Sequence, residues 1–146
     1  MSTSETSRQI AAAKAYFEIL DGGRLPDELF EPDFAFFFPK FGVGRGLDEF
    51  HSFAAGLGAA GLHATHYRDR LNYIESGRQV VVEGATFGKD GEGRTWSGGE
   101  TPGGRFCSVF DFDDSGLITR MFIYLDPDYT GQDAGRFHWR RAKAQW

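Results

Sequence analysis

Two histidines three positions apart, His63 and His66, are the first candidates for acid–base chemistry in this sequence. The residues around them alternate in the two-residue period of a β-strand, so side chains three positions apart point to opposite faces. The pair is therefore unsuited to sharing a metal ion, and we expect no metal site. His63 is on the more apolar face and is predicted to point inward beside Asp69, where the two could move protons near neutral pH. A purely structural role is the alternative for this inward histidine, and His66 is predicted to lie among surface charges.

A run of phenylalanines is the second candidate feature, because it could line a ligand site. Phe34, Phe36 and Phe38 alternate within one predicted strand and therefore face the same way, whereas Phe37 faces the other. Ordinary core packing and an aromatic wall for a flat apolar ligand are both compatible with this pattern, since a pocket of this kind is an underfilled core.

Two other features of the sequence argue against nucleotide binding and against cysteine-based sites. The glycine-rich run 42–46 superficially resembles a dinucleotide-binding loop, but Leu47 stands where the third glycine belongs and no second βαβ unit follows. The single cysteine, Cys107, excludes an internal disulfide and a multi-cysteine metal site, and we expect it to pack in a strand. The sequence therefore predicts no cofactor.

The elements that must position these side chains follow an α+β pattern. Helical segments are predicted over residues 4–21, 26–30 and 47–57, the first capped by Ser4 or Thr6 and closed by Asp21-Gly22-Gly23. Strands are predicted over 33–38, 62–74, 79–88, 105–112 and 117–126, with a loop over 42–46 and a loop or loose hairpin around Trp96 over 89–104. Helices followed by an antiparallel meander indicate one domain with helices on one face of a curved sheet.

Composition narrows the class of protein. A chain of 146 residues fits one domain, and its net charge of −5 argues against a nucleic-acid or anionic-membrane partner. No apolar run approaches the roughly 20 residues that span a bilayer, and residues 1–9 show no signal-peptide core. We therefore expect a soluble cytoplasmic protein. The 20 glycines and 16% aromatic residues suggest curved strands and tight turns around an aromatic interior.

Four ordered segments carry a family resemblance: 16–23, 29–34, 44–50 and 116–126, within a span of about 8–128 that leaves 129–146 as a C-terminal tail. Together they resemble the NTF2-like superfamily, in particular its SnoaL-like members. The resemblance implies a cone-shaped sheet around a deep apolar cavity, often in a homodimer. It says little about chemistry, because the fold hosts isomerases, dehydratases, epoxide hydrolases, polyketide cyclases and binding proteins.

The resemblance also suggests roles for single residues. Tyr16 matches the helical tyrosine that donates a hydrogen bond to the substrate oxygen in ketosteroid isomerases of this superfamily, and Ser108 aligns with their second oxyanion donor. The general-base aspartate of those enzymes lies just before a proline, where this chain has Phe38. Steroid isomerisation by that mechanism is therefore not expected.

Asp126 resembles a carboxylate of the epoxide hydrolases in the superfamily. Their water-activating triad is incomplete here, since Gly84 and Thr86 replace its arginine and second aspartate. Asp126 is still the best single acid–base candidate in the sequence, and a strand-end turn at Asp126-Pro127-Asp128 is the alternative.

We therefore predict a cavity for a small apolar or aromatic molecule of polyketide or terpenoid type. One hypothesis is a cofactor-free isomerase, cyclase, dehydratase or hydrolase, and the other is a non-catalytic ligand-binding or dimerisation module. The predicted catalytic residues are Tyr16, His63, Asp69 and Asp126. The predicted ligand-binding residues are Phe17, Phe34, Phe36, Phe38, Tyr67, Trp96, Ser108, Phe110 and Tyr124.

Three expectations concern assembly and the ends of the chain. The apolar residues of strands 80–87 and 105–112 on the outer sheet face predict a homodimer through that face. Trp96 is predicted to be either a lid over the cavity mouth or a dimer contact. In the tail, Phe137 or Trp139 is expected to dock on the sheet or on the partner subunit.

Overall fold

The computed structural model describes residues 6–98 and 104–136, so Phe137 and Trp139 lie outside the described residues. The helices are α1 (Arg8–Asp21) and α2 (Gly46–Ala59), with short 3-10 helices η1 (Asp27–Leu29), η2 (Arg68–Arg70) and η4 (Ala134–Arg136). The strands are β1 (Phe30–Phe38), β2 (Gly42–Arg45), β3 (His63–His66), β4 (Asn72–Ser76), β5 (Gln79–Lys89), β6 (Thr95–Trp96), β7 (Arg105–Phe112) and β8 (Ile118–Leu125).

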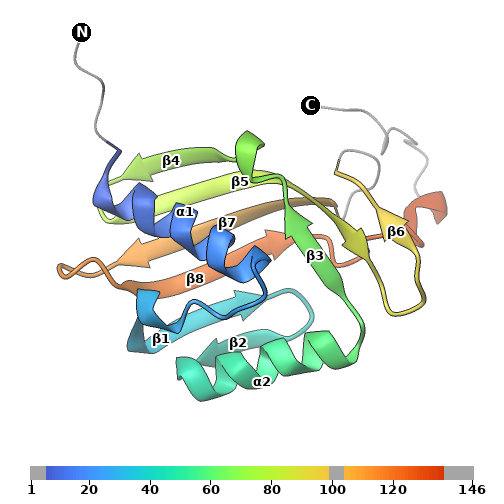
Figure 1. Cartoon of the computed structure of the whole chain (residues 1–146), viewed down its shortest axis with the longest axis horizontal. Coiled ribbons are helices and arrows are strands. Elements are labelled where there is room, and N and C mark those ends of the chain that lie inside the picture. Colours follow the sequence, from blue (N-terminus) through green and yellow to red (C-terminus); the bar gives the residue numbers. More distant parts are fainter. Residues whose placement is uncertain (1–5, 99–103, 137–146) are drawn as a thin grey trace, which may run out of the picture.

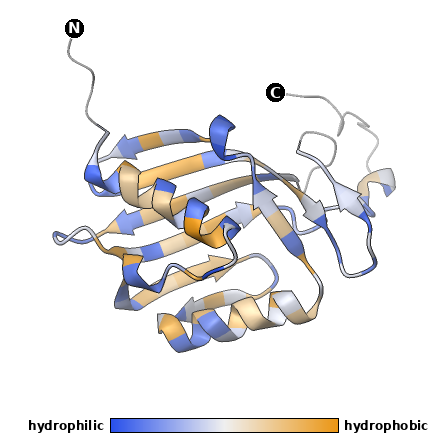
Figure 2. Cartoon of the chain, in the orientation of Figure 1, coloured by the Kyte–Doolittle hydropathy of each residue, from blue (hydrophilic) through white to orange (hydrophobic). Residues whose placement is uncertain are grey.

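One mixed sheet carries both helices on the same face, which confirms the predicted α+β class (Figure 1). The strand order is β2-β1-β8-β7-β5-β3, with β4 and β6 also paired to β5. Every pair is antiparallel except β1 with β8. The hydropathy colouring shows hydrophobic residues along these strands and apolar to neutral residues through the C-terminal half of α2 (Figure 2). No described helix is both long and apolar enough to cross a membrane.

The first helix is capped by a different residue from the predicted Ser4 or Thr6. Ser7 is the N-cap, because its hydroxyl oxygen accepts a hydrogen bond from the Ile10 amide. The helix closes at Asp21 as predicted, with the Gly22 amide donating to carbonyls of the last turn. This boundary leaves the carboxyl group of Asp21 at the very end of α1.

The aromatic strand β1 packs as its alternation predicts. Phe34, Phe36 and Phe38 are buried on the helix-covered face, and Phe37 contacts Phe122 on the other face, their ring centroids 5.6 Å apart. The predicted loop over 42–46 is mostly strand β2, paired antiparallel to β1. Gly44 is needed there, since a Cβ atom would lie 2.2 Å from Cζ of Phe36.

The predicted strand 62–74 is wrong as one element, because it breaks between β3 and β4. His66 pairs with Thr86 and Asn72 with Glu83, so the five residues 67–71 stand opposite only Gly84 and Ala85. Leu71 occupies the space over Gly84, where a Cβ atom would lie 2.4 Å from the Leu71 side chain. The break reverses the alternation: even-numbered residues face inward in β3 and odd-numbered residues in β4.

An apolar row crosses the outer face of the sheet, opposite the helices. Consecutive strand pairings align six residues into this row: Ile74, Val81, Val109, Phe122, Phe37 and Val43. Val43 and Ile74 at its two ends are more than half exposed. Beside it, the Arg120 guanidinium stacks over the Phe122 ring at 3.9 Å and lies 3.5 Å from the Asp111 carboxylate.

Candidate functional site

A cavity of about 380 Å³ lies between the two helices and the sheet. Its walls come from the C-terminal half of α1, from α2, from β3, from inward residues of β1, β5, β7 and β8, and from Tyr129. The lining is mainly apolar, and among the described residues it includes no lysine or arginine. This composition suits an apolar ligand with a few polar groups.

A buried hydrogen-bonded pair, Asp21 and His66, opens on this cavity. The carboxylate of Asp21 at the end of α1 lies 2.8 Å from Nδ1 of His66 at the end of β3. The same carboxylate accepts the backbone N–H of His66 at 3.1 Å, and Nε of Arg68 lies 3.5 Å away on its more exposed side. The Asp21 side chain is 3% exposed and that of His66 13%.

These contacts assign the proton on the imidazole ring. An ionised carboxylate only accepts hydrogen bonds, so Nδ1 of His66 carries a hydrogen, and in the neutral form of the ring Nε2 then keeps its lone pair. The ring packs edge-on against Phe17 and Phe106, with centroids 4.8 and 5.0 Å apart, which fixes its orientation. A neutral His66 held in this way can act as a base through Nε2, and the Asp21 carboxylate stabilises the imidazolium that forms.

Two buried hydroxyl groups line the same cavity. Tyr16 is 3% exposed and Ser108 1%, and neither hydroxyl makes a hydrogen bond within the described part of the chain. Burial, and the nearby Asp21 charge, raise the pKa of Tyr16 above its ordinary value, so the phenol stays protonated. Both hydroxyls can therefore donate to an oxygen atom of a ligand.

The sequence of the chain identifies its family. Residues 13–121 match the sequence profile of the SnoaL-like domain. The chain belongs to the SnoaL-like domain family. No curated protein matches it significantly in sequence.

Solved structures agree with this SnoaL-like assignment. An NTF2-like protein of unknown function from Burkholderia pseudomallei has a TM-score of 0.69 at 21% identity, over 83% of this chain and 92% of its own. A Xanthomonas campestris protein provisionally named a polyketide cyclase has a TM-score of 0.70 at 20% identity, over 82% of this chain and 90% of its own. TerC, co-crystallised with polyporic acid, has a TM-score of 0.68 at 22% identity, over 82% of this chain and 92% of its own. The likenesses establish the NTF2-like fold and confirm the resemblance seen in the sequence.

The SnoaL-like cavity contains the predicted histidine pair in the opposite orientation. His66 faces inward because it pairs with Thr86, an inward residue of β5, whereas His63 pairs with Lys89 and is exposed at the cavity edge. The apolar character that suggested His63 comes from Leu71 and Tyr73, which lie beyond the break in the strand and do pack against the core. The orientation predicted from one continuous strand is therefore wrong.

Neither predicted carboxylate lies in the cavity lining. The Asp69 side chain is 83% exposed in η2, so the predicted pair of His63 with Asp69 inside the cavity is not formed. Asp126 is exposed and accepts the Asp128 amide at 2.9 Å, which is the strand-end turn considered as its alternative. The prediction that both aspartates face the cavity is wrong, because the side chains of Asp69 and Asp126 are exposed to solvent.

The predicted ligand-binding residues divide by position. Phe17, Phe38 and Ser108 line the cavity. Phe34, Phe36 and Phe110 are buried in the core but are not lining residues. Tyr67 lines a separate cleft of about 220 Å³ with Glu83 and Gly84, and Tyr124 is 47% exposed on the outer face.

Trp96 is buried rather than a mobile lid or an exposed contact. Its Nε1–H donates to Thr86 Oγ1 at 3.0 Å, and its ring stacks on that of Tyr129 with centroids 4.7 Å apart. Tyr129 in turn lines the cavity. The indole therefore supports the cavity wall from behind.

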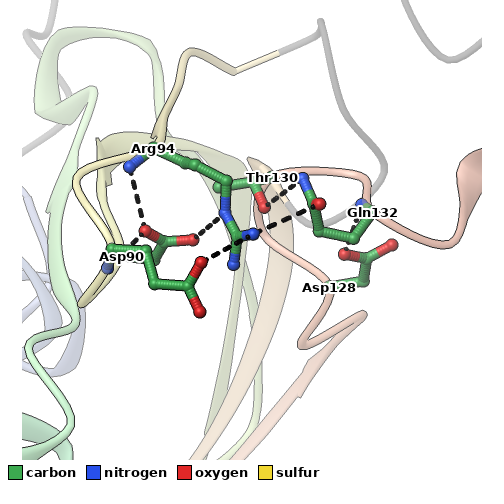
Figure 3. Close-up of polar contacts among 6 residues, drawn as sticks. Asp90, Arg94, Asp128, Thr130 and Gln132 are labelled. Atoms are coloured by element: carbon green, nitrogen blue, oxygen red, sulfur yellow. Dashed lines mark hydrogen bonds and ion pairs between the residues drawn. The ribbon is translucent and has the colours of Figure 1, made fainter.

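Polar contacts hold the two loops around this aromatic stack (Figure 3). Asp90 pairs with Arg94 at 2.6 Å, and Arg94 donates to Gln132 Oε1 at 3.3 Å. The Asp128 carboxylate accepts the Gln132 amide at 2.8 Å. These contacts connect the turn between β5 and β6 to the segment that carries Tyr129.

Sequence reasoning missed two residues of the SnoaL-like site, Asp21 and Tyr129. Asp21 stands in a helix-closing Asp-Gly-Gly turn, where an acidic residue looks like part of the stop signal. Tyr129 lies in the predicted tail. For Asp21, the detectable signal was an acidic residue at a helix end together with a histidine on a strand. No pattern in the sequence specified the contact between Asp21 and His66.

Proposed function

We propose that this SnoaL-like protein binds a small apolar molecule that carries oxygen and transfers protons on it without a cofactor. His66 is the general base in this proposal, replacing His63, with Asp21 as its orienting carboxylate. The observation that carries the proposal is the buried pair of Asp21 and His66 at a cavity that the hydroxyls of Tyr16 and Ser108 also line, neither of them hydrogen-bonded within the described part of the chain.

The geometry supports chemistry beside a carbonyl group. Nε2 of His66 removes a proton from the carbon next to the carbonyl, and Tyr16 or Ser108 donates to the oxygen as its charge develops. Return of the proton to another carbon isomerises the molecule. Loss of a neighbouring hydroxyl, protonated by the imidazolium, dehydrates it, and attack of the enolate on a second carbonyl closes a ring.

The similar structures support an aromatic, oxygenated ligand. TerC was co-crystallised with polyporic acid, and other structures of this fold carry the provisional name of polyketide cyclase. A polyketide- or terpenoid-like molecule fits the largely apolar lining. The second candidate function is ligand binding without catalysis, favoured by the phenylalanine-rich walls.

Exchange of α-protons tests the proposal without knowledge of the natural substrate. 2-Tetralone, a neutral bicyclic ketone, is incubated with the protein in D₂O, and loss of its α-proton signals is followed by NMR. We expect saturable acceleration by the wild type and a loss of about 10²–10⁴-fold in His66→Gln. His51→Gln is the matched control, because His51 is an exposed histidine that pairs with Asp27 away from the cavity.

Three outcomes separate the hypotheses. A wild type that binds tetralone without accelerating exchange leaves only the binding function. Acceleration that survives in His66→Gln removes His66 as the base. Absence of saturable binding contradicts both functions for ligands of this kind.

We also propose that the protein is a homodimer that associates through the outer apolar row. The row from Ile74 to Val43 spans the sheet, and the polar pair of Arg120 with Asp111 lies beside it. An apolar strip with a polar border of both signs is compatible with a twofold contact. The cytoplasmic location expected from the sequence stays a prediction.

A further inference from the structure

The C-terminal half of α2 forms part of the cavity rim. Ala54, Leu57 and Gly58 line the cavity from this helix, and the exposed residues His63 and Ala64 line it from β3. This is therefore a place where the cavity meets solvent. In Figure 1 the same turn of α2 leads directly into β3.

Two glycines in this half of α2 have no packing reason to be glycine. Nearly every other described glycine either has a positive φ angle or leaves no room for a Cβ atom. Only Gly56, Gly58 and Gly135 combine an ordinary φ angle with open space around the position of a Cβ. Two of these three lie within one turn of the helix that borders the cavity.

Glycine inside a helix favours opening of that helix. Relative to alanine it costs about 1 kcal/mol in helix propensity, which corresponds to about fivefold in the local unwinding equilibrium. Only Ala54 and Leu57 of this segment are half-buried against the cavity, whereas Ala55, Gly56, Gly58 and Ala59 are all exposed. The weakest part of the helix thus coincides with the rim of the cavity.

We propose that residues 54–59 are a gate that unwinds locally to admit and release the ligand. The inference rests on the proposed binding function but not on any catalytic step. Unwinding would break the hydrogen bonds from Ala60 N–H to Gly56 and from Leu62 N–H to Leu57, and would withdraw the side chains of Ala54 and Leu57 from the cavity wall.

Gly56→Ala is the test variant, because Gly56 lies inside the gate but does not line the cavity. It stabilises the closed helix and leaves the ligand contacts unchanged. N-phenyl-1-naphthylamine, an uncharged probe that fluoresces in apolar sites, reports association and dissociation by stopped flow. We expect both rates to fall about fivefold with the dissociation constant unchanged, and amide exchange at Ala60 and Leu62 to slow about fivefold.

Two matched variants bracket this result. Ala55→Gly, on the same helix and also outside the lining, should raise the probe rates and the amide exchange about fivefold. Gly135→Ala, at the third glycine of this type but in η4, should change neither.

The outcomes distinguish the gate from the binding function. If Gly56→Ala and Ala55→Gly change the amide exchange rates but leave the probe association and dissociation rates unchanged, the gate is overturned, because the ligand then uses another route. Amide exchange rates that stay unchanged in both variants would also overturn the gate. Absence of saturable probe binding in the wild type would instead contradict the proposed function, and the gate with it.

Discussion

The carboxylate of Asp21 contacts Nδ1 of His66 at 2.8 Å, although the two residues are 45 positions apart in the chain. A second bond from the His66 backbone to the same carboxylate holds the strand end to the helix end. Asp21 therefore fixes the position of His66 and the hydrogen on its ring at the same time. This double contact defines which nitrogen of the His66 ring carries a hydrogen toward Asp21.

We expect His66 to carry its hydrogen on Nδ1 in the resting protein. Two-dimensional NMR of the imidazole nitrogens at pH 8 should show this tautomer in the wild type. In Asp21→Asn the carboxylate that selects it is gone, so the population should shift toward the Nε2–H form. A dominant Nε2–H tautomer in the wild type would contradict the assigned proton.

Loss of the orienting carboxylate should also reduce catalysis. We expect Asp21→Asn to slow α-proton exchange of 2-tetralone by about a hundredfold or more, since the ring then presents the wrong nitrogen and the imidazolium loses its counter-charge. Tetralone affinity should change little. Asp69→Asn is the control, because that side chain is turned to water.

Phe36→Ala should cost about 3–5 kcal/mol of unfolding free energy, measured by urea denaturation. Phe36 is buried, and its ring lies against Phe50 and Phe53 as well as over Gly44. Phe41→Ala is the comparison, since Phe41 is 61% exposed and should lose about 1 kcal/mol or less. Equal losses in the two variants would contradict the packing described for β1.

Stability should fall at alkaline pH because of buried phenols. Burial raises the pKa of Tyr16, with a further contribution from the Asp21 charge, and burial also raises that of Tyr129. Above pH 10 the unfolded chain releases these protons while the native protein keeps them, so each buried tyrosine lowers stability by about 1.4 kcal/mol per pH unit. Urea denaturation between pH 8 and 11 should show this slope, and Tyr16→Phe should reduce it. An unchanged slope would mean that the Tyr16 phenol titrates normally.

Sedimentation tests the outer apolar row. The wild type should sediment at twice the 16.3 kDa mass of the chain at micromolar concentration. Phe122→Asp should give a monomer, because the substitution places a charge in the middle of the row. Phe41→Ser removes an exposed aromatic residue elsewhere and should leave the dimer intact. A monomeric wild type would exclude association through this face.

Local patterns in the sequence specified most of the fold. The closing turn of α1 and the alternation of Phe34, Phe36 and Phe38 depend only on neighbours in the chain, and the structure contains both. The break after His66 depends instead on Leu71 filling the space over Gly84 on another strand. Because that contact is tertiary, no periodicity could place it.

The candidate site was harder to predict for the same reason. Tyr16 and Ser108 were found through the family resemblance, and Phe17 through the apolar face of the predicted helix. The contact of Asp21 with His66 needs the pairing of β3 with β5 and the end of α1 at once. Because the break reverses the alternation, the side chain of His66 faces the cavity where that of His63 was predicted.

The parallel pair of β1 with β8 joins the first strand of the described chain to the last one in the middle of the sheet. Residues 30–37 pair with residues 118–122, so β1 has no partner on that side until nearly the whole chain is available. During synthesis α1, β1 and α2 emerge first with their phenylalanines unburied, and native closure requires a contact of long sequence separation. Folding should therefore be slow for a domain of this size, and a nascent chain that stops before residue 118 should expose an aromatic surface to chaperones.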